Sequence, residues 1–212
     1  MPTLLHISAS PRGDQSESIA IARTFLDALR DVRPDVRVET FDLWDGSLPA
    51  FGPKAAAAKM AVFAGQEPAG EQAAAWQAAV STFRRFADAD YYLFSVPMWN
   101  HGIPYILKQF VDVVSQPGMV FSFDQQRGYT GLLSGRRAVV VYTSAVYGQG
   151  RPPGFGSDFQ ATYFGDWLRW AGITDISEIS FRPGLATADA DCGRQAVHAA
   201  ARDLAKTFLP AV

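Results

Sequence analysis

The sequence has little cysteine, no excess of positive charge and no long apolar run. Its one cysteine, Cys192, cannot form an internal disulfide, which fits a reducing, cytoplasmic compartment. The formal net charge is −2, so no basic face is available for nucleic acid. No apolar run approaches the roughly 20 residues of a membrane-spanning helix, and the N-terminus lacks the pattern of a signal peptide. We therefore expect neither a nucleic-acid partner nor a membrane partner.

Sequence patterns of several kinds of active site are absent as well. The three histidines, His6, His101 and His198, are scattered and lack the spacing of metal ligands. The chain has no Gly-x4-Gly-Lys pattern and no Gly-x-Gly-x-x-Gly after the first predicted strand, which argues against ATP and against a Rossmann dinucleotide site. It also has no Gly-x-Ser-x-Gly elbow, so the sequence does not support a serine hydrolase.

Strands and helices are predicted to alternate along the 212 residues, a length that fits a single domain over 1–212. Apolar runs predict strands at about 4–7, 36–41, 91–96, 138–143 and 173–181, and helical patterns lie between them and after the last one. This alternation is typical of a parallel sheet with helices on both faces. We predict an α/β fold, a flavodoxin-like three-layer sandwich whose five-stranded parallel sheet has the order 2-1-3-4-5.

Two segments interrupt the alternation. Residues 43–70 are predicted to form an irregular insertion in the domain, and a loop of this length is usually a lid or an interface. Residues 121–131 are predicted to form an excursion or a small hairpin rich in aromatic residues.

The loop after the first predicted strand is rich in hydroxyl groups. It begins at Ser10 and leads through Ser16, Glu17 and Ser18 into the first helix. A phosphate group needs several hydrogen-bond donors at once and is stabilised by a helix N-terminus. The loop therefore predicts a phosphate site. The alternative is that Ser16 or Ser18 only caps the helix, because serine is a common N-cap residue.

The loop after the third predicted strand carries flat and polar side chains between two prolines. Pro97, Met98, Trp99, Asn100 and His101 follow the strand directly. The rings of Trp99 and His101 offer planar surfaces, and the Asn100 amide can donate and accept. These properties suit the isoalloxazine ring of a flavin. The alternative is a proline-rich turn whose tryptophan packs in the core.

Both loops lie where ligands bind in open α/β sheets, at the switch point between the first and third strands. Together they predict bound FMN. A third loop follows the fourth strand at the same carboxyl edge of the sheet, where ligands bind in open α/β folds. Its residues are Ser144, Ala145, Val146, Tyr147 and Gly148. The alternative is an ordinary connection between a strand and a helix.

The chain resembles the FMN-dependent NADH azoreductases, a family whose members also reduce quinones. The features that carry this resemblance occur in family order over nearly the whole chain: Ser10, Ser16-x-Ser18, Pro97-Met98-Trp99-Asn100, Leu107-Lys108, Gly131-Leu132, the strand 138–143 with Ser144, and Gly172-Ile173-Thr174. Two positions depart from the family pattern. His101 stands where the family often has phenylalanine, and 145–147 lacks the family's pair of glycines.

The resemblance implies how the site is built. Ser10 and the segment 16–18 would hold the FMN phosphate, the segment 97–101 would line the isoalloxazine, and the segment 144–148 would close the other side. It further implies a homodimer with Phe123 and Trp167 near the substrate.

The function implied is the transfer of two electrons from NADH, with NADPH left open, through FMN to quinones and azo compounds in a ping-pong reaction. FMN carries the chemistry, so no residue is expected to act as a nucleophile. Two alternatives remain at this point. One is a flavodoxin-type electron carrier without a substrate slot, and the other is a flavodoxin-like protein without flavin.

Overall fold

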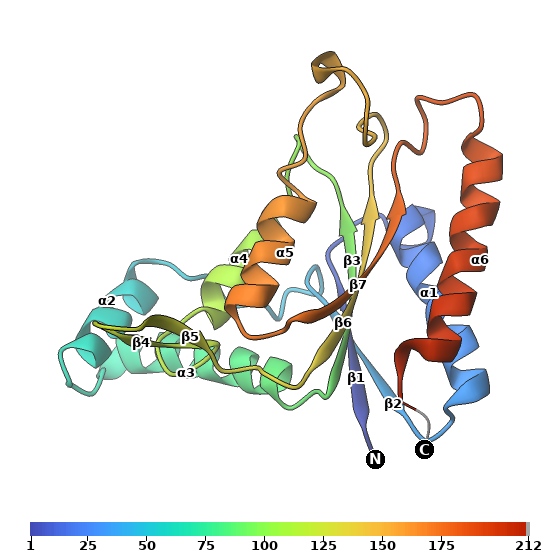
Figure 1. Ribbon diagram of the computed structural model, residues 1–212. Coiled ribbons are helices and arrows are strands. Elements are labelled where there is room, and N and C mark those ends of the chain that lie inside the picture. Colours follow the sequence, from blue (N-terminus) through green and yellow to red (C-terminus); the bar gives the residue numbers. More distant parts are fainter. Residues whose placement is uncertain (211–212) are drawn as a thin grey trace.

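Five parallel strands form the central sheet of the computed structural model, which describes residues 1–210 (Figure 1). The strands are β1 (Thr3–Ser8), β2 (Arg37–Asp42), β3 (Tyr91–Pro97), β6 (Arg137–Thr143) and β7 (Asp175–Phe181). Their order in the sheet is β2-β1-β3-β6-β7, and each neighbouring pair is parallel. The predicted five-stranded parallel sheet is therefore confirmed.

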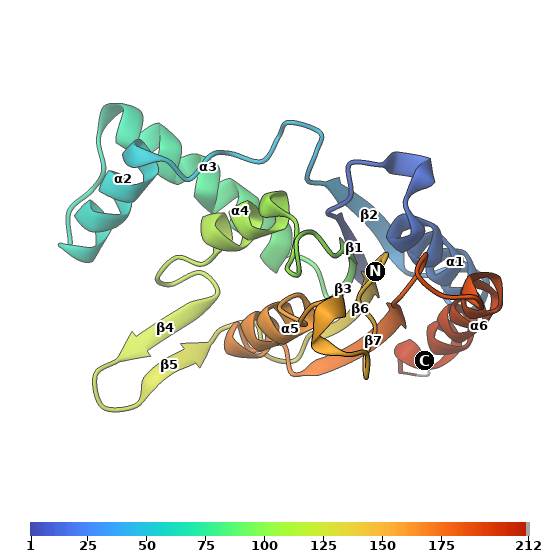
Figure 2. The same cartoon turned by 90° about the horizontal axis from the view of Figure 1, so that it is seen from above.

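The predicted order 2-1-3-4-5 needs a correction in its numbering, because two further strands precede the fourth strand of the sheet. These are β4 (Phe121–Asp124) and β5 (Gly128–Gly131), which pair only with each other in an antiparallel hairpin. The hairpin confirms the excursion predicted at 121–131. It extends away from the sheet, as does α2, which lies apart from the hairpin (Figure 2).

Helices cover both faces of the sheet (Figures 1 and 2). One face is covered by α1 (Glu17–Val32) and α6 (Ala190–Phe208), and the other by α3 (Gly70–Ala87), α4 (Tyr105–Val114) and α5 (Ala161–Trp170). Side chains alternate across a strand, so Leu4 joins the core under α1 and α6, whereas Leu5 and Ile7 join the opposite core. This arrangement is the predicted flavodoxin-like three-layer sandwich.

The segment 43–70 is less irregular than predicted. It contains α2 (Pro53–Phe63), which lies against α3 (Figure 1). Alanine has the highest helix propensity, Pro53 occupies the first helical turn, and Ala55 and Ala58 are buried. The prediction of an irregular insertion is therefore wrong for the residues of α2, because high alanine content favours a helix even without a clear apolar stripe.

His6 is a titratable side chain buried inside the fold. It points from β1 toward the α1 side, is 4% exposed, and its Nε2 lies 2.7 Å from Ser95 Oγ. Burial, with a smaller contribution from the positive charge of Arg23, lowers the pKa of His6 from 6.5 to about 4. The histidine is therefore neutral in the folded protein at pH values where it is partly protonated in the unfolded chain.

This burial predicts a pH dependence of stability. Between pH 6.5 and about 4 the unfolded chain binds a proton at His6 that the folded protein does not bind, so the free energy of unfolding falls as the pH decreases. The loss from this one group is roughly 3 kcal/mol. Urea titrations at pH 7 and pH 4 should show a smaller loss for His6→Gln than for the wild type. Equal losses would contradict this account. His198→Gln is the matched control: burial also lowers the pKa of His198, but this side chain is only half-buried, so its replacement should reduce the loss less than His6→Gln does.

Candidate functional site

The loops that follow β1, β3 and β6 meet at the carboxyl edge of the sheet. They are tied together by backbone hydrogen bonds from Ala9 N–H to the Ser95 carbonyl (3.1 Å) and from Met98 N–H to the Thr143 carbonyl (2.7 Å). Two adjoining cavities of about 250 and 310 Å³ lie among these loops. Both are lined by Met98, Ser144 and Ala145, so they form one continuous site.

We call the smaller space the serine cavity. It is lined by Ser10, Arg12, Gln15, Ser16, Glu17, Pro97, Met98, Trp99, Thr143, Ser144, Ala145, Phe181, Gly184 and Leu185. The structure thus brings together most of the residues predicted in the first two loops. Sequence reasoning missed Arg12 and Gln15, although both belong to the serine-rich loop, and a cation in such a loop could have been recognised as a partner for an anion.

The N-terminus of α1 faces this cavity with its first turn. Ser16 is the N-cap, and its Oγ accepts a hydrogen bond from Ile19 N–H at 3.5 Å. The other amides of the first turn have no acceptor within the helix and carry the positive end of its dipole. Glu17 is paired with Arg194 at 2.8 Å, which offsets its negative charge. The capping interpretation of Ser16 is therefore correct, yet the helix start still offers donors to an anion.

Ser18 lies outside the cavity. Its side chain is fully buried, and its Oγ shares a hydrogen bond with Ser16 Oγ at 3.1 Å. The Ser18 carbonyl accepts a hydrogen bond from Ser95 Oγ at 3.3 Å. These contacts make Ser18 a support for the helix start, and the structure does not bring its hydroxyl to the predicted phosphate site.

The loop after β3 forms a tight turn. Trp99 and Gly102 exchange two backbone hydrogen bonds of 2.9 Å, and the two residues between them have left-handed φ values, +47° for Asn100 and +70° for His101. These are the features of a type I′ turn, in which glycine is common and histidine is unusual. Trp99 is half-buried beside Trp44 and lines the serine cavity, so it does more than fill the core.

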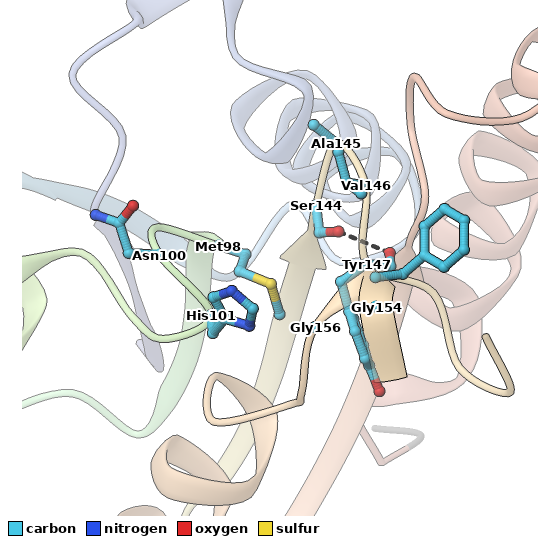
Figure 3. Close-up of a pocket in the computed structure, with 10 residues that line it drawn as sticks. Met98, Asn100, His101, Ser144, Ala145, Val146, Tyr147, Gly154 and Gly156 are labelled. Atoms are coloured by element: carbon cyan, nitrogen blue, oxygen red, sulfur yellow. Dashed lines mark hydrogen bonds between the residues drawn. The ribbon is translucent and has the colours of Figure 1, made fainter. Parts of the chain in front are cut away.

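We call the larger space the histidine cavity. It is lined by Met98, Asn100, His101, Ser144, Ala145, Val146, Tyr147, Gly154, Phe155 and Gly156. Figure 3 shows Met98 and His101 on one side of it and the segment from Ser144 to Tyr147 on the other. The Ser144 hydroxyl donates a hydrogen bond to the Tyr147 carbonyl at 2.7 Å and so holds the turn of the third loop (Figure 3).

Gly148, the last residue predicted for the third loop, does not line either cavity in the described residues 1–210. Its φ is not left-handed, so it does not give the loop the backbone freedom of a glycine pair. A Cβ at Gly148 would instead lie 2.7 Å from Pro183 Cδ. Glycine is needed there because the loop packs closely against the chain that follows β7.

A partly buried ion pair orders the chain around the histidine cavity. Arg182 lies 2.7 Å from Asp158, and its guanidinium stacks over the Tyr147 ring at 5.4 Å. The same carboxylate accepts a hydrogen bond from Ala161 N–H at 2.8 Å and thereby caps α5. The end of β7, the third loop and the start of α5 are therefore held together by one charged group.

The two residues predicted near the substrate lie outside both cavities in the described residues 1–210. Trp167 is 5% exposed, stacks on Phe86 and Phe164 in the core, and donates its indole N–H to Ser115 Oγ at 2.9 Å. Its placement corrects the prediction of a slot residue, because Trp167 lies on the buried face of α5 together with Phe164 and Leu168. Phe123 is 60% exposed on the hairpin that extends from the sheet.

The described residues contain no cluster of His, Cys, Asp and Glu that could hold a metal ion, and none of their helices is long and apolar enough to span a membrane. The serine cavity is the polar end of the site, with hydroxyls, a helix N-terminus and Arg12. It is continuous with the histidine cavity, a flatter space between two loops. It fits a cofactor that has a phosphate at one end and a planar ring at the other.

Comparisons with known proteins agree with this geometry. A family profile described as a flavodoxin-like fold matches residues 2–208. The chain is 47% identical over 195 residues to a Ruegeria pomeroyi protein named FMN-dependent NADH:quinone oxidoreductase, with 91% of this chain and 95% of the relative covered. A protein of the same name from Desulfotalea psychrophila is 40% identical over 185 residues, with 87% of each chain covered.

A solved structure with the same fold is that of an FMN-dependent NADH-azoreductase from Bacillus anthracis in complex with FMN. It is 22% identical, has a TM-score of 0.89, and the match covers 99% of this chain and 100% of the other.

The different positions of Ser10 and Ser18 predict different mutant effects. Ser10 lines the serine cavity, whereas Ser18 is buried behind it. Ser10→Ala should weaken FMN binding by about 1.5–3 kcal/mol, the value of a hydrogen bond to a charged group. Ser18→Ala should instead lower the free energy of unfolding by about 0.5–1.5 kcal/mol. Fluorescence titration of FMN and urea unfolding measure the two effects. Unchanged FMN affinity in Ser10→Ala would exclude this serine from the phosphate site.

Proposed function

We propose a function for this chain, which belongs to the flavodoxin-like family of FMN-dependent NADH:quinone oxidoreductases. It is an FMN-dependent enzyme that passes two electrons from NADH to quinones and azo compounds. The observation that carries this function is the continuity of the serine and histidine cavities, which matches the phosphate and the ring of FMN. The enzymatic function is favoured over a flavodoxin-type electron carrier because the relatives named above are reductases.

The serine cavity is the site that we assign to the FMN phosphate. Ser10, Ser16 and the amides at the start of α1 would donate hydrogen bonds to it, and Arg12 would add a positive charge. Glu17 would not repel the phosphate strongly, since Arg194 pairs with its carboxylate. Ser18 contributes by fixing the cap at Ser16, to which its hydroxyl is bonded.

The histidine cavity is the site that we assign to the isoalloxazine. Met98, Asn100 and His101 would line one side of the ring, and the segment 144–147 would line the other. When bound, FMN supplies the two-electron transfer between nicotinamide and acceptor. The protein contributes a rigid bed: the turn from Trp99 to Gly102 and the bond from Ser144 to Tyr147 are formed within the chain itself.

A homodimer is part of this proposal. Apolar side chains are exposed on the two elements that extend from the sheet, with Phe63 on α2 at 59% exposure and Phe123 and Tyr129 on the hairpin at 60% and 58%. A partner subunit that covers these elements would bury them, and Phe123 would then lie near the partner's substrate slot. We place the enzyme in the reducing cytoplasm, where its exposed Cys192 stays a thiol.

The kinetic prediction follows from one continuous site that both substrates share. NADH and the quinone would occupy the same space in turn. Double-reciprocal plots of initial rate against quinone concentration, measured at several fixed NADH concentrations, should therefore give parallel lines. In a stopped-flow experiment, NADH alone should bleach the flavin absorbance within the turnover time. Intersecting lines would contradict the shared site, and an electron carrier would not be bleached by NADH alone.

The dimer proposal makes a prediction for sedimentation. Wild-type protein at micromolar concentration should sediment at twice the chain mass of 23.1 kDa. Tyr129→Glu should shift it toward monomer, since a charge buried in an apolar interface is costly. Arg127→Glu, on the same hairpin but at a polar side chain, is the matched control and should sediment as a dimer. A wild-type monomer with full activity would refute the proposal.

A further inference from the structure

The tautomer of His101 is determined by the fold. Its Nδ1 lies 3.1 Å from Ser157 N and accepts the hydrogen bond of that backbone amide. A backbone N–H can only donate, so Nδ1 carries no proton. The neutral imidazole must therefore carry its proton on Nε2.

A hydrogen bond, the backbone conformation of His101 and one packing contact fix the position of the ring. The His101 carbonyl accepts a hydrogen bond from Phe159 N–H at 3.0 Å, and the residue itself is held at a φ of +70°. Gly156 packs against the imidazole so closely that a Cβ there would lie 2.5 Å from both Nδ1 and Cε1. The chain from Gly156 to Phe159 thus packs most closely against the Nδ1–Cε1 edge of the ring.

The Nε2–H group is a free donor at the histidine cavity. His101 is exposed, lines this cavity together with Met98 and Val146, and its Nε2 makes no hydrogen bond to another group of residues 1–210 (Figure 3). A proton on Nδ1 would point at the Ser157 amide and place two donors against each other, so the neutral ring presents its N–H at Nε2.

We propose that His101 Nε2–H donates a hydrogen bond to a carbonyl oxygen of the acceptor and makes the enzyme selective for acceptors with such an oxygen. The inference rests on the proposed function, because the acceptor is taken to stack on the solvent-facing side of the flavin ring, at the mouth of the histidine cavity where His101 is exposed. No proton leaves His101 in this interaction. NADH supplies a hydride, which carries two electrons and one proton. The second proton that converts a quinone to a hydroquinone comes from water. Gly156 and Ser157 are positioning residues for this donor.

The tautomer is tested directly by nitrogen NMR on the wild-type protein. In ¹⁵N-labelled protein at neutral pH, the ring signals of His101, assigned by their loss in His101→Phe, should show a pyridine-type Nδ1 and a pyrrole-type Nε2. The opposite assignment, or a doubly protonated ring, would overturn the inference without any measurement of activity.

Selectivity is tested with two ligands that share one bicyclic carbon skeleton, one with carbonyl groups and one without. The FMN-loaded, oxidised protein is titrated with 1,4-naphthoquinone and with naphthalene, and the change in flavin absorbance gives the two dissociation constants. Loss of one neutral hydrogen bond predicts that the preference for naphthoquinone falls about 2- to 12-fold in His101→Phe.

Two variants separate hydrogen bonding from shape. His101→Gln has the same left-handed backbone position as His101→Phe but retains a side-chain N–H, so it should recover most of the preference. Gly156→Ala keeps the histidine and displaces its ring, so the preference should fall. A preference that is equal in the wild type and His101→Phe would overturn the proposal. So would a variant that loses FMN affinity alone, since the donor would then serve the flavin.

These titrations contain no NADH and no turnover, so they fail independently of the proposed function. Absence of flavin bleaching by NADH would contradict the proposed function and leave the ligand preference measurable. Normal bleaching together with an unaltered preference would contradict only the role of His101.

Discussion

The parallel register of β1, β3 and β6 is the constraint on which the site depends. Ser8 pairs with Ser95, and Pro97 pairs with Thr143, so the three strands end close together at one edge of the sheet. Backbone hydrogen bonds continue the register just beyond the strands, from Ala9 to Ser95 and from Met98 to Thr143. The register of the strands therefore places the polar loops side by side. Their position depends on the sheet and not on the conformation of each loop alone.

A second level of order comes from the segment between β6 and α5. Asp158 caps α5 and pairs with Arg182, while Ser157 and Gly156 hold the imidazole of His101. The wall of the histidine cavity is thus linked both to the turn after β3 and to the end of β7. A partly buried ion pair contributes little net stability, because the cost of its desolvation offsets its attraction, but it specifies one arrangement of the groups that it joins. Here it specifies how the loops around the ring site are placed relative to each other.

The sheet and the two main loops could be predicted because both leave local signals. The run Tyr91–Val96 is apolar or aromatic at every position but Ser95, because both faces of the strand are covered, and Ser16 precedes a helix as a cap does. The three-dimensional role of single residues left no such signal. Ser18 and Trp167 have the residue types of a binding site, yet packing turns one into a helix support and the other into a core residue. The alanine-rich α2 was missed because it has no strong apolar stripe.

The turn at Trp99–Gly102 was beyond sequence reasoning for a different reason. A type I′ turn is usually recognised by Asn-Gly, and here His101 takes the second central position, held there by contacts that come from more than 50 residues away in the chain.

The central claim is that the two cavities together hold one cofactor. The direct measurement is chromatography of flavin released by heat from the purified protein. The account predicts FMN at about one molecule per chain, and the finding of FAD, or of no flavin after incubation with FMN, would contradict it.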